Sequence, residues 1–317
     1  MSAYKSYSVI FTSIIYLIFL FFIGCDTEPS SPALPTINNP SFQQNPEMTS
    51  TDTSVLRVWE WENITIPSYT YPDATAFGDG LFVDVAFDTL GVFIRDDHMY
   101  FHLDPESPIT PDSSISPNNY RSEIHTMPWN IEHPLGTEQW MGWKYIFCES
   151  YVIDPSSPIT IFQNHPGIIG MSPAIELEIA REGQVIGALG GEIQIINAPN
   201  NTRYLTDFRP VAGDTLDIVI QVVHDLGSNG YFRVWFNDEL VHEEVASTVY
   251  DGYEFGGNNK WGVYHHNFND DPTEVVSSLD AGAGLVELAM GTLRLLTRGS
   301  DHFEYRTNAF DLVTPNQ

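Results

Sequence analysis

The sequence is poor in basic residues and almost free of cysteine. Its 317 residues contain 13 Lys and Arg against 42 Asp and Glu, a formal net charge of −29. So few cations exclude a broad nucleic-acid-binding surface, because phosphate contacts need clustered Lys and Arg. The two cysteines, Cys25 and Cys148, exclude a disulfide framework and a cysteine-rich metal site. Core material is plentiful, since 42% of the residues are hydrophobic, and this excludes a disordered chain.

The first 25 residues have the pattern of an export signal. Lys5 is the only charged residue before Asp26, and a nearly unbroken apolar run of 15 residues extends from 9 to 23. Such a run is short for a membrane span and suits the core of a signal peptide. The segment Phe-Ile-Gly-Cys at 22–25 resembles a bacterial lipobox, which implies cleavage before Cys25 and lipidation of Cys25. The alternative is an uncleaved anchor helix. Both place the folded part outside the cytoplasm, and the lipobox predicts a lipid-anchored protein of the bacterial cell envelope, in the periplasm or at the cell surface.

The rest of the chain divides into a tether, one folded domain and a tail. Five prolines stand among Ser, Thr, Asn and Gln between residues 26 and 54, a composition typical of a semi-extended spacer. We therefore expect a signal peptide at 1–24, a lipidated Cys25 with a flexible tether at 25–54, a folded domain at 55–300 and a C-terminal tail at 301–317.

Short alternating segments dominate the expected folded domain. The run Ala174–Ile179 alternates strictly between apolar and polar side chains, as a half-buried strand does. Similar runs occur at Leu81–Phe87, Met99–Leu103, Glu192–Ile196, Leu216–Val223 and Tyr231–Phe236. We also expect a hairpin turn at 236–239 and a final strand over 284–296. The pattern predicts an all-β fold, a two-sheet β-jelly-roll sandwich of the concanavalin-like kind, with Cys148 buried as a small hydrophobe.

Three segments concentrate polar and ionisable side chains on one face of a predicted strand. They read Arg-Ser-Glu at 121–123, Gln-Asn-His at 163–165 and Lys-Trp-Gly-Val-Tyr at 260–264. Because side chains alternate along a strand, Arg121, Glu123 and His125 share one face. Gln163 and His165 share a face for the same reason. Three ionisable groups on one face exclude a dry core there and indicate solvent or a polar groove.

The three segments resemble, in this order and at matching separations, the signature strands of jelly-roll polysaccharide lyases. The likeness extends over residues 55–298 and includes the jelly-roll alginate lyases and the heparin-lyase and glucuronan-lyase group, which the segment 136–143 also resembles. The sequence departs at His125, where alginate lyases often carry a second Arg, and at His265 and His266, which replace Asn-Gln. The resemblance implies a lyase that cleaves a uronic-acid-containing polysaccharide by β-elimination without a metal. The departures leave alginate, glucuronan and related polymers open.

β-Elimination needs a group that neutralises the C5 carboxylate, a base for the C5 proton and an acid for the leaving oxygen at C4. Arg121 offers a planar fork suited to a carboxylate, and Gln163 offers a second hydrogen bond. His165 is the expected base, because the pKa of histidine lies near neutrality, and Tyr264 is the expected acid. Tyr264 can serve as both base and acid when the C5 proton and the leaving oxygen lie on one side of the sugar ring.

The other expected substrate-binding residues are Glu123, His125, Lys260 and Asn267. We expect Glu123 to hold Arg121 or a histidine in position, and Trp261 to shape the subsites beside Asn267. Lys144 and Lys260 are expected to add positive potential for an anionic polysaccharide.

Two other functions fit the same fold. A sandwich glycoside hydrolase needs two carboxylates on one face, which Glu176 and Glu178 supply, although they equally fit the outward face of an amphipathic strand. A non-catalytic carbohydrate-binding lipoprotein would stack tryptophans on sugars, although most of the seven tryptophans are expected in the core. The run at 269–271 offers oxygen ligands for a structural calcium. The lyase itself is expected to need no cofactor and to be a monomer.

Overall fold

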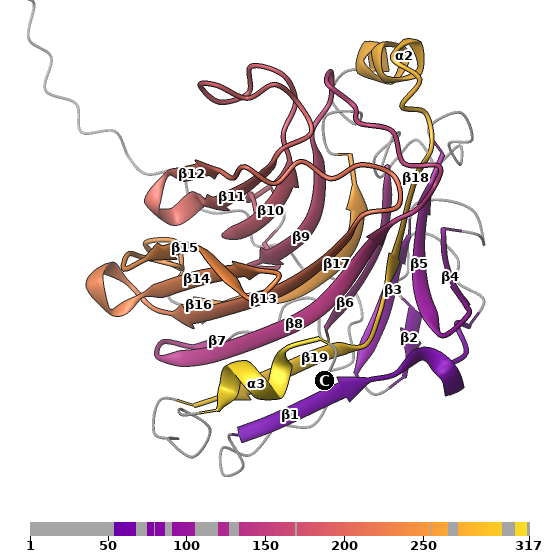
Figure 1. Cartoon of the computed structure of the whole chain (residues 1–317). Coiled ribbons are helices and arrows are strands. Elements are labelled where there is room, and N and C mark those ends of the chain that lie inside the picture. Colours follow the sequence, from indigo (N-terminus) through magenta and orange to yellow (C-terminus); the bar gives the residue numbers. More distant parts are fainter. Residues whose placement is uncertain are drawn as a thin grey trace, which may run out of the picture. The chain divides into compact units, whose positions relative to one another are not determined.

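Two antiparallel sheets stack face to face in the computed structural model, which describes residues 54–67, 75–78, 80–85, 91–104, 120–126, 133–168, 170–253, 255–265, 272–299 and 308–315 (Figure 1). The first sheet has nine strands and the second has eight. The expected all-β jelly-roll sandwich is therefore confirmed. The predicted signal peptide, Cys25 and the tether as far as residue 53 lie outside the described residues.

The nine-stranded sheet follows the order β15-β14-β13-β8-β18-β5-β4, with β19 paired to β8 and β1 paired to β19. Its strands are β1 (Ser54–Trp59), β4 (Val92–Arg95), β5 (His98–Leu103), β8 (Thr137–Phe147), β13 (Thr215–His224), β14 (Tyr231–Phe236), β15 (Glu239–Glu244), β18 (Val286–Met290) and β19 (Leu293–Arg298).

The eight-stranded sheet follows the order β12-β11-β10-β9-β17-β6-β3-β2. Its strands are β2 (Thr75–Phe77), β3 (Leu81–Val85), β6 (Arg121–Thr126), β9 (Ile159–His165), β10 (Ile175–Ile179), β11 (Ile193–Asn197), β12 (Thr202–Leu205) and β17 (Asn258–Tyr264). A separate short pair joins β7 (His133–Pro134) to β16 (Phe255–Gly256).

The hydrophobic core lies between the two large sheets. Trp143 of β8 packs against Phe162 of β9 and Trp261 of β17, with ring centroids 5.3 and 6.2 Å apart. The Tyr145 hydroxyl crosses the core and donates a hydrogen bond of 2.7 Å to the Ile161 carbonyl. The tryptophans buried in the structure are Trp59, Trp61, Trp140, Trp143 and Trp261, which agrees with the expected core position of most of them.

The predicted hairpin is confirmed, whereas the predicted last strand is two strands. Asn237 and Asp238 join β14 to β15 with φ of 48° and 65°, the left-handed values that a tight hairpin turn requires. The prediction of one continuous strand over 284–296 was wrong. The segment divides at Gly291 into β18 and β19, which both pair with β8 but in registers that differ by one residue.

The helices are few and short. The 3₁₀ turns are η1 (Trp61–Asn63), η2 (Ala198–Asn200) and η3 (Gly227–Asn229). Helix α2 (Pro272–Asp280) has no counterpart among the predicted elements. The expected tail contains α3 (Ala309–Val313), which packs so closely on β8 that a Cβ at Gly142 would lie 1.8 Å from the Val313 carbonyl oxygen. None of the helices in the described ranges is long and apolar enough to span a membrane.

Candidate active site

The three sequence motifs lie on three consecutive strands of the eight-stranded sheet. β17 pairs with β6 on one side and with β9 on the other (Figure 1). Lys260 stands opposite both His125 and Gln163, and Tyr264 stands opposite Arg121. Segments about 140 residues apart in the chain therefore meet on one patch of sheet, as the shared-face argument requires.

The alternation of each strand sends the polar residues to the face away from the core. Ile124, Trp261 and Val263 belong to the buried core cluster, so their neighbours Glu123, Lys260 and Tyr264 point to the opposite face. The expectation that Trp261 shapes a subsite was wrong. Its ring lies in the core between the sheets, because it is one residue away from Lys260 along the strand.

A β-bulge at Ile161 changes which residues of β9 reach this face. The pairing of β9 shifts at this point against both β10 and β17. As a result Thr160 and Gln163, three residues apart, both lie on the polar face, while Ile161 and Phe162 are both in the core. A bulge of this kind re-aims side chains next to many active sites.

Asp84 of β3 is the residue that the sequence motifs missed. Its Oδ2 accepts hydrogen bonds from Arg121 Nη1 at 2.8 Å and from Lys260 Nζ at 2.7 Å. Burial opposes ionisation of Asp84, but Arg121 and Lys260 outweigh it and hold the pKa of this carboxyl below its usual range. Asp84 stands opposite Glu123 in the pairing of β3 with β6, and it is this pairing that identifies Asp84 as a residue of the site.

Glu123 binds the same two cations from the other side. Its Oε2 lies 3.2 Å from Arg121 Nε and 3.7 Å from Lys260 Nζ, and its Oε1 accepts a 2.6 Å hydrogen bond from Gln163 Nε2. Burial raises the pKa of Glu123 and lowers the pKa of Lys260, whose side chain is fully buried. The four charges of Asp84, Glu123, Arg121 and Lys260 thus balance within the sheet face.

Arg121 is the cation of this cluster that remains accessible. Its side chain is 15% exposed, whereas that of Lys260 is 0% exposed. The guanidinium carbon lies 4.3 Å from the centre of the Tyr264 ring. Burial alone would lower the pKa of Arg121, but Asp84 and Glu123 raise it, so the guanidinium is permanently charged. Two of its nitrogens face Asp84 and Glu123, and Nη2 has no such partner in the described part of the chain.

The two histidines of the motifs are held in neutral form. Burial, together with the charges of Lys260 and Arg121, lowers the pKa of His165 to about 3. The Gly167 N–H donates to His165 Nδ1 at 2.9 Å, and the ring also hydrogen-bonds the backbone of Met171. Burial lowers the pKa of His125 to about 4, and its ring stacks on Phe82 at 5.4 Å. Neither ring is a free, easily protonated imidazole.

Glu176 and Glu178 lie on the same polar face, one strand beyond β9. Glu176 stands opposite Gln163 in the register and accepts a hydrogen bond from the Thr160 hydroxyl at 3.4 Å. Burial, with the nearby charge of Glu178, raises the pKa of Glu176 to about 8. Both carboxylates are buried rather than on an open, solvated face.

Several expected residues lie elsewhere. Lys144 is in the nine-stranded sheet, 3.3 Å from Asp217, so the expectation that it adds positive potential to the site was wrong. Burial raises the pKa of Cys148 to about 11, which fits a structural thiol. Asn267, His266 and the predicted calcium run at 269–271 lie outside the described residues. Among the residues that are described, no three His, Cys, Asp or Glu side chains form a group suited to a metal ion.

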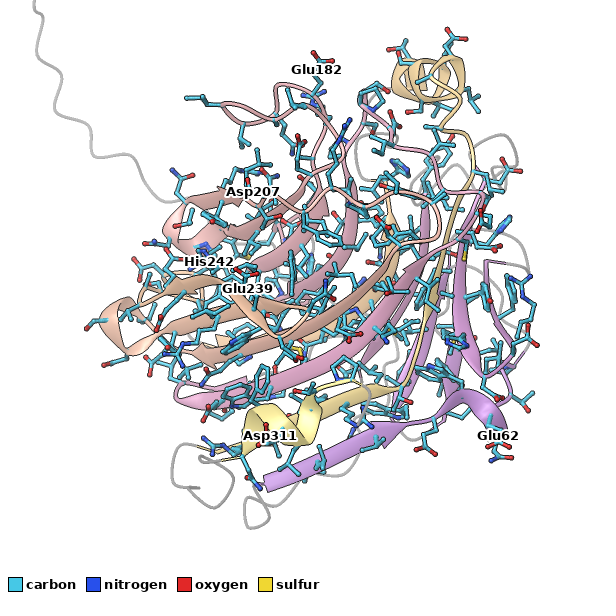
Figure 2. All side chains as sticks on the ribbon, in the orientation of Figure 1. Glu62, Glu182, Asp207, Glu239, His242 and Asp311 are labelled. Carbon is cyan, nitrogen blue, oxygen red and sulfur yellow. The ribbon has the colours of Figure 1, made fainter. Side chains whose placement is uncertain are left out.

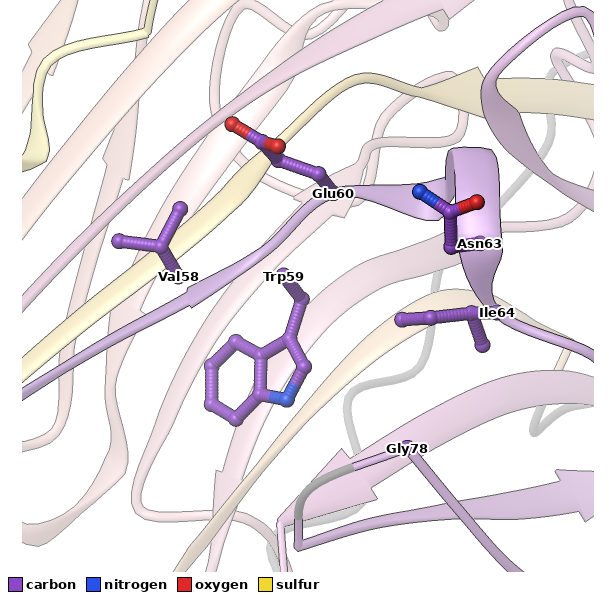
Figure 3. A pocket seen from close by; sticks show the side chains of 6 residues that line it. All are labelled: Val58, Trp59, Glu60, Asn63, Ile64 and Gly78. Carbon is purple, nitrogen blue, oxygen red and sulfur yellow. The ribbon is translucent and has the colours of Figure 1, made fainter.

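A pocket of about 520 Å³ lies away from the motifs, at β1 and η1 (Figure 3). It is lined by Val58, Trp59, Glu60, Asn63, Ile64 and Gly78. None of the motif residues lines it, so it is separate from the candidate active site.

Comparison with known proteins agrees with the motifs. The sequence matches the family model described as polysaccharide lyase over residues 95–277. Among solved structures, an endo-β-1,4-glucuronan lyase from the fungus Trichoderma reesei is 18% identical, with a TM-score of 0.47 over 81% of this chain and 94% of that chain. An alginate lyase of polysaccharide lyase family 7 is 15% identical, with a TM-score of 0.45 over 67% of this chain and 86% of that chain. No curated relative matches the sequence. Because the family model covers more than half of the chain, this protein belongs to the polysaccharide lyase family.

Proposed function

We propose that this lyase cleaves a uronic-acid-containing polysaccharide by β-elimination at the face formed by β6, β9 and β17. The observation that carries the proposal is the Arg121 guanidinium, fixed by Asp84 and Glu123 and lying 4.3 Å from the centre of the Tyr264 ring. Its Nη2 binds the C5 carboxylate of the substrate, and Gln163 adds a hydrogen bond from beside it. Neutralising this carboxylate lets charge spread into it as the C5 proton leaves.

Tyr264 is the group best placed to move the proton. In the step we propose, its phenolate takes the C5 proton, a C4–C5 double bond forms, and the C4–O4 bond breaks. The phenol then gives its proton to the departing O4 and returns to phenolate. The positive charge of Arg121 against the ring stabilises the phenolate.

His165 is less suited to be the base than its sequence motif suggests. Because the Gly167 N–H donates to Nδ1, a neutral His165 carries its proton on Nε2, which then donates and cannot accept. We therefore assign His165 a positioning role beside Gln163. A single tyrosine that acts as both base and acid must approach one side of the sugar ring. This suits D-glucuronate or D-mannuronate, in which H5 and O4 lie on the same face of the sugar.

Ultraviolet absorbance of the product double bond tests this proposal. The chain is offered glucuronan, polymannuronate and polyguluronate. We expect absorbance to rise with at least one of the first two, and Tyr264→Phe to lower kcat roughly a thousandfold. Tyr231→Phe, in the nine-stranded sheet, is the matched control and should act as wild type. His165→Ala should retain more activity than Tyr264→Phe. If His165→Ala instead lost more activity than Tyr264→Phe, and the wild-type enzyme preferred polyguluronate, His165 would be the base and the assignment of Tyr264 as the base would be wrong.

We also propose that the enzyme works from the cell envelope, tethered by a lipid on Cys25 and without a cofactor. The support is the lipobox-like segment 22–25 and the proline-rich stretch that follows it. Metabolic labelling with a radioactive fatty acid in a bacterial host should mark the wild-type chain and leave Cys25→Ala unmarked. Labelling of both chains alike would refute the anchor.

A further inference from the structure

The ladder between β9 and β17 is irregular beside the proposed reaction point. Regular pairing ends at Phe162 of β9 and resumes only at Thr160, which stands opposite Tyr264. In the gap β9 has one residue, Ile161, whereas β17 has two, Gly262 and the residue after it. The backbone groups of unequal segments cannot all pair with each other, and a buried backbone group without a partner is costly.

A side chain of the other sheet fills this gap. The Tyr145 hydroxyl of β8 donates to the Ile161 carbonyl at 2.7 Å and accepts a hydrogen bond from the Gly262 N–H at 3.0 Å. One hydroxyl thus joins a carbonyl of β9 to an N–H of β17, as a ladder hydrogen bond does elsewhere in the sheet. Burial raises the pKa of Tyr145 well above its usual range, so the hydroxyl keeps its proton and remains a donor.

Aromatic packing between the sheets fixes the position of the Tyr145 hydroxyl. Side chains fill the space between the two sheets (Figure 2), and Tyr145 is fully buried in this core. Its ring makes T-shaped contacts with Trp143 and Phe101, at centroid distances of 5.9 and 6.5 Å. Trp143 itself packs on Phe162 of β9. Because these rings hold the phenol from several sides, its hydroxyl has one fixed place between β9 and β17.

The two backbone groups that Tyr145 joins lie close to side chains of the proposed reaction. Gly262 is two residues from Tyr264, and Ile161 is two residues from Gln163. A shift of β9 against β17 at the gap would therefore move Gln163 and Tyr264 relative to each other. An error of about 1 Å in the placing of reacting groups can cost on the order of a hundredfold in rate.

We propose that Tyr145 is a positioning residue for the elimination, because its hydroxyl replaces the missing ladder hydrogen bond between β9 and β17 and so sets the position of Tyr264 relative to Gln163. This inference rests on the proposed function, since it takes Tyr264 to move the proton and Gln163 to bind the substrate carboxylate. Tyr145 itself does not touch the substrate, because it is fully buried on the core side of the sheet.

Tyr145→Phe tests the inference, because it removes the hydroxyl and keeps the ring. Activity is measured by ultraviolet absorbance on the polymer that the wild-type enzyme cleaves best. We expect kcat to fall on the order of tenfold and KM to stay within about twofold of wild type. KM changes little because Asp84 and Glu123, which hold Arg121, lie on β3 and β6, away from the gap. Wild-type kcat in a folded Tyr145→Phe variant would overturn the inference.

Thr206→Val is the matched control for the loss of a buried hydroxyl. The Thr206 hydroxyl donates to the Ile193 carbonyl at 2.7 Å and accepts from the Phe208 N–H at 3.2 Å, so it also joins two backbone groups. It follows β12 at the edge of the eight-stranded sheet, next to Asp207 (Figure 2). Both variants should unfold at a lower temperature than wild type, but only Tyr145→Phe should lose kcat. Equal losses of kcat would overturn the inference.

A double-mutant cycle separates positioning from a general loss of structure. In the Tyr264→Phe background, Tyr145→Phe should lower the remaining kcat by a clearly smaller factor than in the wild type, because the phenol that it positions is gone. A merely structural effect would lower kcat by the same factor in both backgrounds. That result would contradict the positioning of Tyr264 by Tyr145.

Tyr145→p-aminophenylalanine decides the question if Tyr145→Phe does not fold. The amino group keeps a donor for the Ile161 carbonyl and is a weaker acceptor for the Gly262 N–H. A kcat below wild type with an unchanged KM would support the inference, and a wild-type kcat would overturn it. If the wild-type chain forms no double bond with glucuronan, polymannuronate or polyguluronate, the proposed function fails, and the inference fails with it.

Discussion

Asp84 shows how one carboxylate can fix two cations of different exposure. It binds Arg121, which is 15% exposed and is the proposed partner of the substrate carboxylate, and Lys260, which is fully buried. Asp84→Asn would remove the negative charge 2.7 Å from Lys260 Nζ, leaving the Glu123 carboxylate 3.7 Å from it, and would release the Nη1 end of Arg121. Breaking a buried ion pair on one side costs about 3 kcal/mol of unfolding free energy. We expect urea unfolding to show a loss of this order, together with a higher KM and a lower kcat.

The control for Asp84 is a similar pair in the other sheet. Asp217 lies 3.3 Å from Lys144, and both side chains are 26% exposed. A more exposed pair is screened by water, so Asp217→Asn should cost no more than about 1 kcal/mol and leave kcat and KM unchanged. Asp84→Glu should recover part of the lost activity, because it restores the charge. Wild-type KM and kcat in Asp84→Asn would show that Asp84 does not position Arg121.

At the scale of elements, the contact between β17 and β6 depends on a missing side chain. Gly262 has φ of 141°, and a Cβ there would lie 2.2 Å from the Ser122 carbonyl oxygen. Gly262→Ala must push apart the two strands that carry Tyr264 and Arg121. We expect a loss of at least about 3 kcal/mol in unfolding free energy and a large loss of activity. Thermal unfolding followed by circular dichroism measures the first effect and absorbance the second.

Gly291→Ala provides the comparison for Gly262→Ala. The nearest atom to a Cβ at Gly291 is the Lys144 Cβ at 3.7 Å, an ordinary van der Waals distance. Gly291→Ala should therefore change the unfolding temperature little. Equal effects of the two substitutions would argue that the close approach of β17 to β6 is not what Gly262 provides.

Several strands were predictable because local alternation of apolar and polar residues encodes them. β10 and the β14–β15 hairpin follow directly from their residues, and so does the common face of Arg121 and Glu123. Asp84 was not predictable, because its role depends on β3 lying next to β6, and strand order is a property of the whole sheet. The bulge at Ile161 and the complete burial of Lys260 also depend on neighbouring strands. The inward position of Trp261 follows from alternation along β17, because its neighbour Lys260 lies on the polar face.

At the scale of the whole molecule, a polar network crosses the hydrophobic core and joins the two sheets. His224 of β13 pairs with Gln139 of β8 at 2.9 Å, and Gln139 accepts a hydrogen bond from Asn259 of β17 at 3.1 Å. Asn259 in turn accepts one from Asn164 of β9 at 2.8 Å. Asn164 and Asn259 each adjoin a residue of the candidate active site, His165 and Lys260. The network therefore fixes the register of the strands that carry the site.

This network makes the fold sensitive to acid. Burial lowers the pKa of His224 to about 3 and that of its stacked neighbour His133 to about 4. In the unfolded chain each has a pKa near 6.5, so between these values the unfolded state binds more protons. The contribution of the pair to stability is therefore complete above about pH 6.5 and is lost as the pH falls toward 3. His224→Gln removes one of these groups and should flatten the acid side of the stability profile measured by urea unfolding between pH 4 and pH 8.

His98→Gln, which changes a histidine outside the core that contacts the Asp96 carbonyl, should keep the wild-type slope. If His224→Gln keeps that slope as well, the acid sensitivity arises elsewhere and the core network does not control it.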